Sequence, residues 1–368
     1  MTPFHILLLW LGYVAPLIKC YFWTPVEPNQ PFPLPEVTSP EVLPDSEEPS
    51  RNAASNAPPI LQSGWLSAIS ANGPITVWPI SGVVKRHHRV RYCYADEDSK
   101  NKASCILHKA LEIWNTALGG GPGKSSGHNL AFSEVTFLGK PQYCFKEYWY
   151  HEERGRRNWR VRNDVLSVYW KDEQKTGGVS SATVGYTPKE HGPGYKGYRH
   201  DLVIAENSAP DVIAHEIGHV LGMMHEMTRA DRDDYIEYRC SKVMGYVESL
   251  NRAVEIAQKK GMSTDLHHLH EQICTNSTFA YKARFAGRNF IKTDARHDRS
   301  GEPDYASIMM YDSTSFANEE CESDLSQCPM VKIKKENGVR VGVEMIERAK
   351  VPSAQDVAFV KEHYPWNG

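Results

Sequence analysis

Alternating and helical patterns of apolar residues begin near residue 75 and run to the end of the chain. Residues 88–95 alternate, with Val90, Tyr92 and Tyr94 on one face, which predicts a β-strand. Apolar positions within 103–117 fall on one side of a predicted helix. Further strands are expected at 134–138, 165–170, 180–186 and 202–206.

Three more helices are predicted from their end signals. One begins near Pro210, with an acid in its first turn, and ends at Gly222. A second long helix is expected at 245–260, closed by Gly261. Ser353 is the expected N-cap of a C-terminal helix. Together the elements indicate an α+β fold: a small sheet with two helices above a cleft, and a less regular half below it.

The first 74 residues lack such patterns. Residues 1–20 contain a short leucine-rich run typical of a secretory signal peptide, although no Lys or Arg precedes it. A buried core strand and an uncleaved anchor are the alternatives for this run. Residues 21–74 are rich in proline and polar residues, so we expect a pro-segment or linker that does not fold alone.

Cysteine content and charge indicate the class of protein. Eight cysteines suit a secreted, disulfide-bonded chain, but connectivity stays open beyond a possible short loop between Cys321 and Cys328. If Cys20 leaves with the signal peptide, seven cysteines remain and one of them is free; if it is retained, it can pair. Asn276 begins a glycosylation sequon, which is usable only in a secretory pathway. A net charge of −3 gives no reason to expect nucleic acid as a partner.

The most informative motif is H-E-x-x-H-x-x-G-x-x-H, which runs from His215 to His225. His215 and His219 lie four residues apart, on one face of a helix, where both imidazoles can reach one zinc ion. Gly222 allows the sharp turn that brings His225 back to the metal. Three histidines leave one coordination position for water, as in catalytic zinc sites. Glu216 is then the candidate general base on the zinc-bound water.

This motif resembles the metzincin pattern of zinc endopeptidases. The continuation from Glu226 through Arg229 to Tyr235 resembles the astacin family in particular. A second match is Ser307-Ile308-Met309-Met310-Tyr311, similar to the family's S-I-M-H-Y segment, although Met310 replaces its histidine. The resemblance implies that Met309 lies in a Met-turn beneath one zinc ion per chain. It implies that Tyr311 binds zinc and stabilises the transition state.

The resemblance also sets expectations for the rest of the chain. It implies a metzincin-type catalytic domain over 75–368, with a small twisted mixed sheet, the active-site helix and a second long helix in the upper half, and a C-terminal helix in the irregular lower half. It is weaker around Gly178–Gly185, the edge strand that would hold substrate, and around 353–365. Residues 186–205 and 238–300 look like insertions.

How such an enzyme would be kept inactive is not evident from the chain. The F-x-G-D sequence of a family-type aspartate switch does not occur, and residues 21–92 contain no cysteine that could act as a cysteine switch. The candidate processing sites are Arg51 and Lys85–Arg86. The resemblance implies that a freed N-terminus approaches Glu226, because a buried carboxylate needs a partner.

Two histidine groups outside the motif have simpler explanations. We expect His267, His268 and His270 to lie on a polar helix face or loop, although clustered histidines can bind metal. His87 and His88, beside Lys85–Arg86, are expected at an exposed strand edge or in a processing loop.

These observations favour a secreted, extracellular zinc endopeptidase made as a zymogen. Its expected partners are polypeptide substrates and an activating protease, with no nucleic acid and no stable membrane association. One alternative is a catalytically inactive secreted binding protein with the metzincin fold, and another is a non-peptidase zinc hydrolase. The presence of Glu216, Tyr311 and all three histidines argues against the former, and Tyr311 argues against the latter.

Overall fold

The computed structural model describes residues 65–69, 73–82, 86–146, 156–172, 178–189, 197–293, 298–299 and 301–367. Contacts divide the chain into Met1–Pro31 and Phe32–Gly368, and all described residues lie in the second unit. The expected signal peptide and most of the expected pro-segment therefore lie outside the described residues. None of the described helices is both long and apolar enough to cross a membrane.

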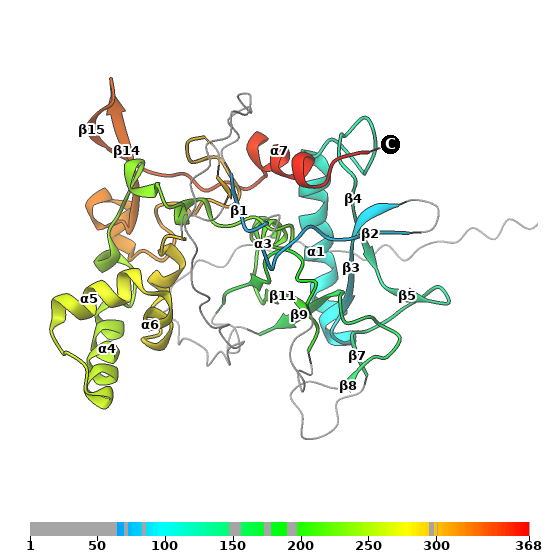
Figure 1. Cartoon of the computed structure of the whole chain (residues 1–368), viewed down its shortest axis with the longest axis horizontal. Helices are drawn as coiled ribbons and strands as arrows, with labels where there is room; N and C mark the ends of the chain where they lie inside the picture. Colours follow the sequence, from blue (N-terminus) through cyan, green and yellow to red (C-terminus); the bar gives the residue numbers. More distant parts are fainter. Residues whose placement is uncertain are drawn as a thin grey trace, which may run out of the picture. The chain divides into compact units, whose positions relative to one another are not determined.

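A mixed six-stranded sheet forms the first part of the fold (Figure 1). Its central strand β3 pairs in parallel with β4 and β9, and β9 pairs in parallel with β11. Two short antiparallel strands, β10 and β2, complete it. The strands are β2 (Ile80–Ser81), β3 (His87–Tyr94), β4 (Leu130–Glu134), β9 (Leu166–Lys171), β10 (Ser181–Ala182) and β11 (His200–Ala205).

Two helices pack against each other and against this sheet: α1 (Glu97–Ala117) and α3 (Pro210–Val220). The indole of Trp114 on α1 donates a hydrogen bond of 2.8 Å to the carbonyl of Ala214 on α3. Helix α1 begins earlier than the expected residue 103 because Asp96 caps it, accepting a hydrogen bond from the Ser99 amide.

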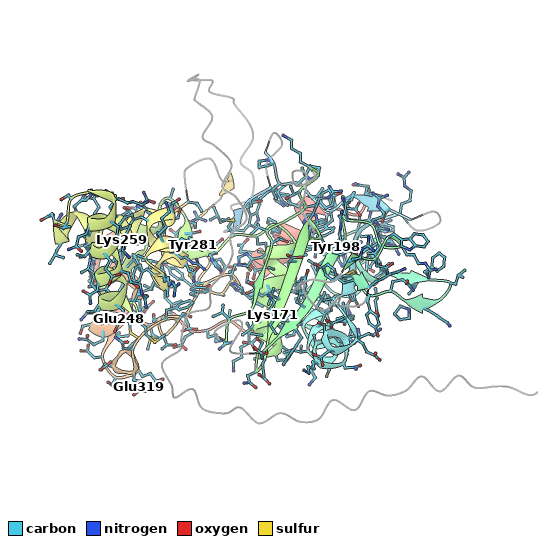
Figure 2. The ribbon with its side chains drawn as sticks, turned by 90° about the horizontal axis from the view of Figure 1, so that it is seen from below. Lys171, Tyr198, Glu248, Lys259, Tyr281 and Glu319 are labelled. Atoms are coloured by element: carbon cyan, nitrogen blue, oxygen red, sulfur yellow. A yellow bond between two sulfur atoms is a disulfide. The ribbon has the colours of Figure 1, made fainter. Side chains whose placement is uncertain are left out.

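A second hydrophobic cluster forms around α4 (Tyr246–Lys260), α5 (Leu266–Thr275) and α6 (Ser277–Lys282). Figure 2 labels Glu248 and Lys259 on α4 and Tyr281 on α6. A separate three-stranded sheet comes from the chain on either side of these helices. It consists of β12 (Ile236–Tyr238), which precedes them, and β14 (Met330–Glu336) and β15 (Val339–Glu344), which follow them. Helix α7 (Ala354–His363) begins with a capping box between Ser353 and Asp356.

The predicted α+β class and mixed sheet are confirmed, with several differences in detail. The strand expected at 134–138 is split between β4 and β5 (Thr136–Phe137), which pairs with β6 (Lys140–Pro141). The strand expected at 180–186 is reduced to Ser181–Ala182, and Gly178 and Gly185 on either side have left-handed φ angles of 74° and 60°. Two further short strands, β7 (Phe145–Lys146) and β8 (Arg156–Arg157), pair antiparallel.

The second long helix is confirmed at the predicted residues. The helix expected at 245–260 is present as α4, but its buried face consists of Ser249, Ala253 and Ala257, and it packs with α5. The helix beside α3 is α1 instead. Small residues let α4 approach another helix closely, so its partner is helical rather than the sheet.

The prediction of exposed histidines at 87 and 88 was wrong. Both are buried on β3. The His87 Nδ1 lies 2.6 Å from the side-chain oxygen of Asn129, and the His88 Nδ1 lies 2.6 Å from the carbonyl oxygen of Trp78. Polar groups are buried at low cost when they are hydrogen bonded, and these partners are 42 and 10 residues away in the sequence.

Three disulfides close loops in the described chain: Cys93–Cys144, Cys240–Cys274 and Cys321–Cys328. The last is the short loop that the spacing suggested. Cys105 is disulfide-bonded as well, so the described residues contain no free cysteine.

The packed chain includes residues 65–69, which the sequence assigned to the linker. Strand β1 (Leu66–Ser67) pairs with β13 (Asp298–Arg299) and bridges to Met223. Trp65 is buried and meets the rings of Phe359 and His363 edge-on, at 5.6 and 5.4 Å. This segment, the N-terminal strap, ties α7 to the turn that follows α3.

The strap should therefore contribute to stability. Trp65→Ala removes a large buried side chain, and we expect the free energy of unfolding to fall by about 3–5 kcal/mol. Trp159→Ala is the matched control, because Trp159 is 75% exposed, and it should change the value by no more than about 0.5 kcal/mol. Urea titrations of both variants measure this. Equal, small effects would show that the strap is not part of the cooperative fold.

Candidate metal centre

Helix α3 carries the first two histidines of the motif on one face. Pro210 occupies its first turn together with Asp211, and the helix ends with Leu221 as its C-cap. His215 and His219 are one turn apart, and their rings are edge-on at a centroid distance of 4.9 Å. His219 is buried and His215 is partly exposed.

Gly222 turns the chain so that His225 meets the other two imidazoles. Its φ angle is +102°, a conformation that glycine adopts without steric cost. A side chain here would also collide with Ile69 of the N-terminal strap, 2.6 Å from where a Cβ would lie. The Nε2 atom of His225 lies 3.0 Å from the Nε2 atoms of both His215 and His219.

The opposite ring nitrogens of two of these histidines face backbone carbonyls. The Nδ1 of His215 lies 2.7 Å from the carbonyl oxygen of Ile308, and the Nδ1 of His219 lies 2.9 Å from that of Met223. A neutral imidazole that donates from Nδ1 has a lone pair on Nε2. Burial lowers the pKa of His215 to about 3 and that of His219 to about 4, so both rings are neutral.

This donor set fits a zinc ion. The Nε2 atoms of His215 and His219 and the nitrogen of His225 lie close enough together to bind one metal ion. Nitrogen ligands of a tetrahedral zinc lie ~3.3 Å apart when each Zn–N distance is about 2.05 Å, close to the spacing seen here. Three histidines with hydrogen bonds to their outer nitrogens are typical of catalytic zinc sites.

Glu216 lies beside the first ligand and is buried. Burial raises the pKa of its carboxyl group to about 8, while a backbone hydrogen bond from Ala182 on β10 acts in the opposite direction. A carboxylate with a raised pKa accepts a proton more readily than an exposed one near neutral pH. The position suits a general base.

Met309 lies directly beneath α3. It is fully buried, and its sulfur would be 2.4 Å from a Cβ atom added to Gly218. The Met309 carbonyl accepts a hydrogen bond of 3.1 Å from the Glu226 amide. The absence of a side chain at Gly218 thus allows α3 to contact Met309 closely. The sequence did not predict this requirement, because Gly218 occupies a position of the motif at which any residue is allowed.

The next two residues turn towards the second hydrophobic cluster. Met310 is buried in that cluster, so an apolar side chain stands where the family has histidine. The Tyr311 ring lies 4.6 Å from the His225 ring and 5.8 Å from the His215 ring. Burial raises the pKa of Tyr311 well above its ordinary value, and the charge of Glu216 adds to this, so its hydroxyl remains a proton donor.

Glu226 is buried next to the last ligand, with Arg229 as its charged neighbour. Its carboxylate lies 3.7 Å from the Arg229 guanidinium and accepts a hydrogen bond of 3.4 Å from the Asp304 amide. Burial raises the pKa of Glu226 to about 8. The guanidinium is also held by Asp231 at 3.0 Å. An internal cation therefore lies beside Glu226, where the family resemblance implied an N-terminal ammonium.

Asp356 on α7 supports the Met-turn from below and was not among the expected site residues. Its carboxylate accepts hydrogen bonds from the Ser307 hydroxyl at 2.6 Å and from the Ile308 amide at 2.8 Å. The same residue completes the N-terminal cap of α7. Because Ile308 provides the carbonyl that orients His215, the C-terminal helix is linked to the metal centre by two hydrogen bonds in series.

Comparison with known proteins agrees with the geometry of the site. The sequence model of the Astacin peptidase family matches residues 194–269. The resemblance to the astacin family is confirmed. The matched segment contains the three histidines, Glu216 and Glu226, and ends before the Met-turn. It also runs through parts of the two segments expected to be insertions, so that 194–205 and 238–269 are family-like in sequence.

Individual relatives match only part of this chain or match it at low sequence identity. Flavastacin from Elizabethkingia meningoseptica is 32% identical over 116 residues, which is 32% of this chain. The chain spans 17% of the length of that curated relative. Among solved structures, the hatching enzyme zinc-protease high choriolytic enzyme 1 from Oryzias latipes matches with a TM-score of 0.41 and 16% identity, over 77% of this chain and 92% of its own. Myroilysin matches with a TM-score of 0.37 and 14% identity, over 80% and 97%.

The rival histidine cluster, which is family-like in sequence up to residue 269, does not form a comparable site. The Nδ1 atom of His270 on α5 and the Tyr246 hydroxyl form a hydrogen bond of 2.6 Å. The nearby Cys240 and Cys274 sulfurs are joined to each other, so they offer no thiolate. His267 and His268 lie on the same helix without metal-ligand geometry among the described residues.

The contact between Gly218 and Met309 predicts a specific steric effect. Gly218→Ala should lower the free energy of unfolding by about 1–3 kcal/mol and weaken zinc binding, because the added Cβ would lie 2.4 Å from the sulfur of the buried Met309, which must then move. Met309→Ala should remove the obstacle, so the double variant should cost clearly less than the sum of the two single changes. Thermal unfolding and zinc titration measure both. Strict additivity would show that the two residues do not press on each other.

Proposed function

We propose that this chain is a secreted zinc endopeptidase of the astacin type. The observation that carries the proposal is the convergence of His215, His219 and His225 beside the buried carboxylate of Glu216. The family match over 194–269 supports the same conclusion. One zinc per chain would be held by the three histidines, with Gly222, Glu226 and Met309 as structural residues of the site.

Zinc bound there supplies Lewis-acid chemistry, which polarises a substrate carbonyl and lowers the pKa of water towards about 7. Glu216 accepts the proton of the attacking water on its carboxylate and then returns it to the nitrogen of the departing amine. Tyr311 remains protonated and donates a hydrogen bond to the oxyanion that develops on the carbonyl. The carbonyls of Ile308 and Met223 keep His215 and His219 oriented.

The substrate class follows from the edge strand. Strand β10 lies at one end of the main sheet and pairs only with β11 among the described strands. Its outer edge can pair with the backbone of an extended polypeptide, while the Ala182 amide is engaged by Glu216. Backbone pairing of this kind gives affinity for peptides with little dependence on sequence.

Secretion and processing are part of the proposal. Residues 1–20 would act as the signal peptide, and an activating protease would remove part of 21–74. The burial of Trp65 supports a processing site before that residue rather than at Lys85–Arg86. Asn276 is exposed. Its side-chain oxygen caps α6, and its amide nitrogen donates a hydrogen bond of 3.4 Å to the Gln272 side chain, which glycosylation would replace.

Glu216→Gln tests the general base. The amide keeps the shape of the side chain but cannot accept the proton, so turnover of a quenched peptide should fall by about 10²- to 10⁴-fold. Zinc content should stay at one per chain by elemental analysis. Glu112→Gln, on the exposed side of α1, is the matched control. Zinc without hydrolysis in the unsubstituted, N-terminally trimmed chain would instead support the inactive binding protein.

Tyr311→Phe tests the oxyanion donor. Loss of the hydroxyl should reduce kcat by about 10²- to 10³-fold and leave KM within a few-fold, since the hydrogen bond strengthens only in the transition state. Tyr246→Phe removes a hydroxyl from the second cluster and should retain full activity. A Tyr311→Phe enzyme with unchanged kcat would show that this ring serves only in packing.

A further inference from the structure

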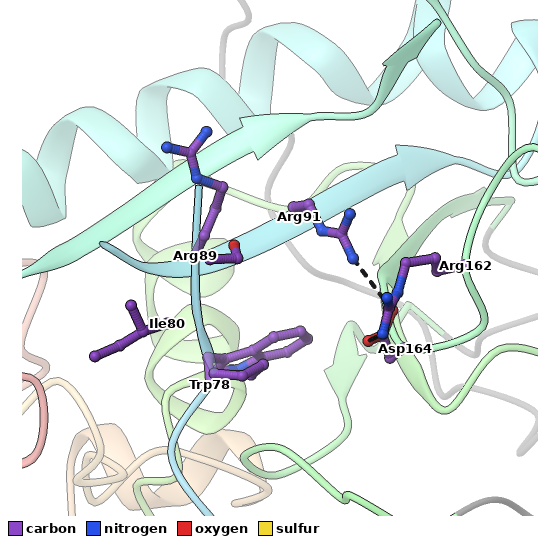
Figure 3. Close-up of a pocket in the computed structure, with 8 residues that line it drawn as sticks. Trp78, Ile80, Arg89, Arg91, Arg162 and Asp164 are labelled. Carbon is purple, nitrogen blue, oxygen red and sulfur yellow. Dashed lines mark hydrogen bonds and ion pairs between the residues drawn. The ribbon is translucent and has the colours of Figure 1, made fainter. Parts of the chain in front are cut away.

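A cavity lies beside the main sheet, lined by residues that the peptidase site does not use (Figure 3). Its volume is about 230 Å³. Strand β4 covers one edge of β3 from His88 to Tyr92. On the other edge, pairing with β2 ends at His88, and pairing with β9 begins at Tyr92. The cavity opens at this interruption, beside Arg89 and Arg91.

The walls combine cationic and apolar groups. Arg89 and Arg91 are two apart on β3 and so project to the same face, opposite the buried Val90. Arg162 joins them from the loop before β9, and Asp164 is the acidic residue among the lining groups. Trp78 lies at the base, with Pro79 and the 43% exposed Ile80 beside it.

The single carboxylate is already committed to two of the three guanidiniums. Asp164 is buried and accepts hydrogen bonds from Arg162 at 3.1 and 2.8 Å and from Arg91 at 3.3 Å. Burial alone would raise the pKa of Asp164, but these guanidinium groups lower it, so the carboxylate is ionised. Its charge offsets one cation and leaves the cavity strongly positive.

Arg89 is the group without a counterpart. Its Nε atom is buried with no hydrogen-bond partner, and its guanidinium has no ion pair within the described part of the chain. Buried donors are hydrogen bonded in nearly all structures, so the Arg89 Nε is a donor that an acceptor bound in the cavity would satisfy. Three arginines and one carboxylate among the lining residues also give the cavity an excess of positive charge, which favours an anion.

We propose that this cavity binds the oxyanion group of a small ligand, a sulfonate, sulfate, phosphate or carboxylate, with Arg89 as its principal contact. The planar fork of a guanidinium matches two oxygens of such a group. Ile80 and Pro79 provide an apolar wall for a ring or chain attached to the oxyanion. The site is separate from the histidine cluster and does not depend on peptidase activity.

Calorimetric titration of the full chain tests the proposal with three probes at constant ionic strength: sodium sulfate, benzenesulfonate and benzenesulfonamide. The two anions should bind, benzenesulfonate at least as tightly as sulfate, and the neutral sulfonamide should not. Arg89→Gln should weaken benzenesulfonate binding by at least about tenfold, as expected for loss of a charge-assisted hydrogen bond. Arg252→Gln on α4, outside the cavity, should bind like the unsubstituted chain.

Further variants separate this proposal from folding defects and from the proposed function. Arg89 has no partner to lose, so Arg89→Gln should unfold at the temperature of the parent chain. If it does not fold, Arg89→Lys takes its place, because lysine keeps the charge but lacks the planar fork, and benzenesulfonate binding should still weaken. Glu216→Gln should bind the anions normally. Equal affinity of Arg89→Gln and the parent chain, or equal binding of sulfonate and sulfonamide, would overturn the proposal.

Discussion

The convergence of three imidazole nitrogens at one location is the constraint on which the rest of the structure depends. The Nε2 atom of His225 lies 3.0 Å from the Nε2 atoms of both His215 and His219, and the backbone must hold the rings in this arrangement. The carbonyl groups of Ile308 and Met223 fix the rings of His215 and His219 from outside. These two rings are therefore oriented by the fold before any metal binds.

Holding the rings requires elements from distant parts of the sequence. Asp356 of the C-terminal helix positions Ile308 by a hydrogen bond. Met309 lies so close to α3 that a side chain at position 218 would collide with it, and the N-terminal strap packs against Gly222 in the same way. Each contact has a partner tens to hundreds of residues away. The metal centre is therefore also the place where the N-terminal strap, α3, the Met-turn and α7 are joined, and loss of any one affects both stability and zinc affinity.

Local patterns were sufficient for the elements with strong periodicity and clear ends. The strand at Val90, Tyr92 and Tyr94, the helix beginning at Pro210 and the helix closed by Gly261 all follow from spacing and end signals. The three ligands and Glu216 could be named because i, i+4 spacing and a glycine turn are local constraints. Assignment of Tyr311 needed the family resemblance, since a lone tyrosine carries no such signal.

Features set by long-range partners could not be found in this way. His87 and His88 appear exposed from their charged neighbours, yet Asn129 and Trp78 satisfy them in the interior. The proline-rich composition of 21–74 conceals Trp65 and Leu66, whose burial depends on α7 and on the turn after α3. Helix α4 shows an amphipathic pattern, but the pattern does not state whether a sheet or another helix covers its small residues.

The replacement of the family histidine by Met310 illustrates how the two hydrophobic clusters meet at the metal. Met309 belongs to the cluster of the main sheet, and Met310 belongs to the cluster around α4, α5 and α6. Tyr311 follows immediately and packs against the rings of Phe290 and Phe316 in the second cluster. An apolar residue at 310 anchors this turn in the second cluster, so the orientation of the Tyr311 ring depends on packing within the α4–α6 region as well as on the zinc ligands beside it. The region that follows the three histidines thus has a physical route by which to influence the orientation of the Tyr311 ring, through Phe290 at its end, without contributing a residue to the histidine cluster.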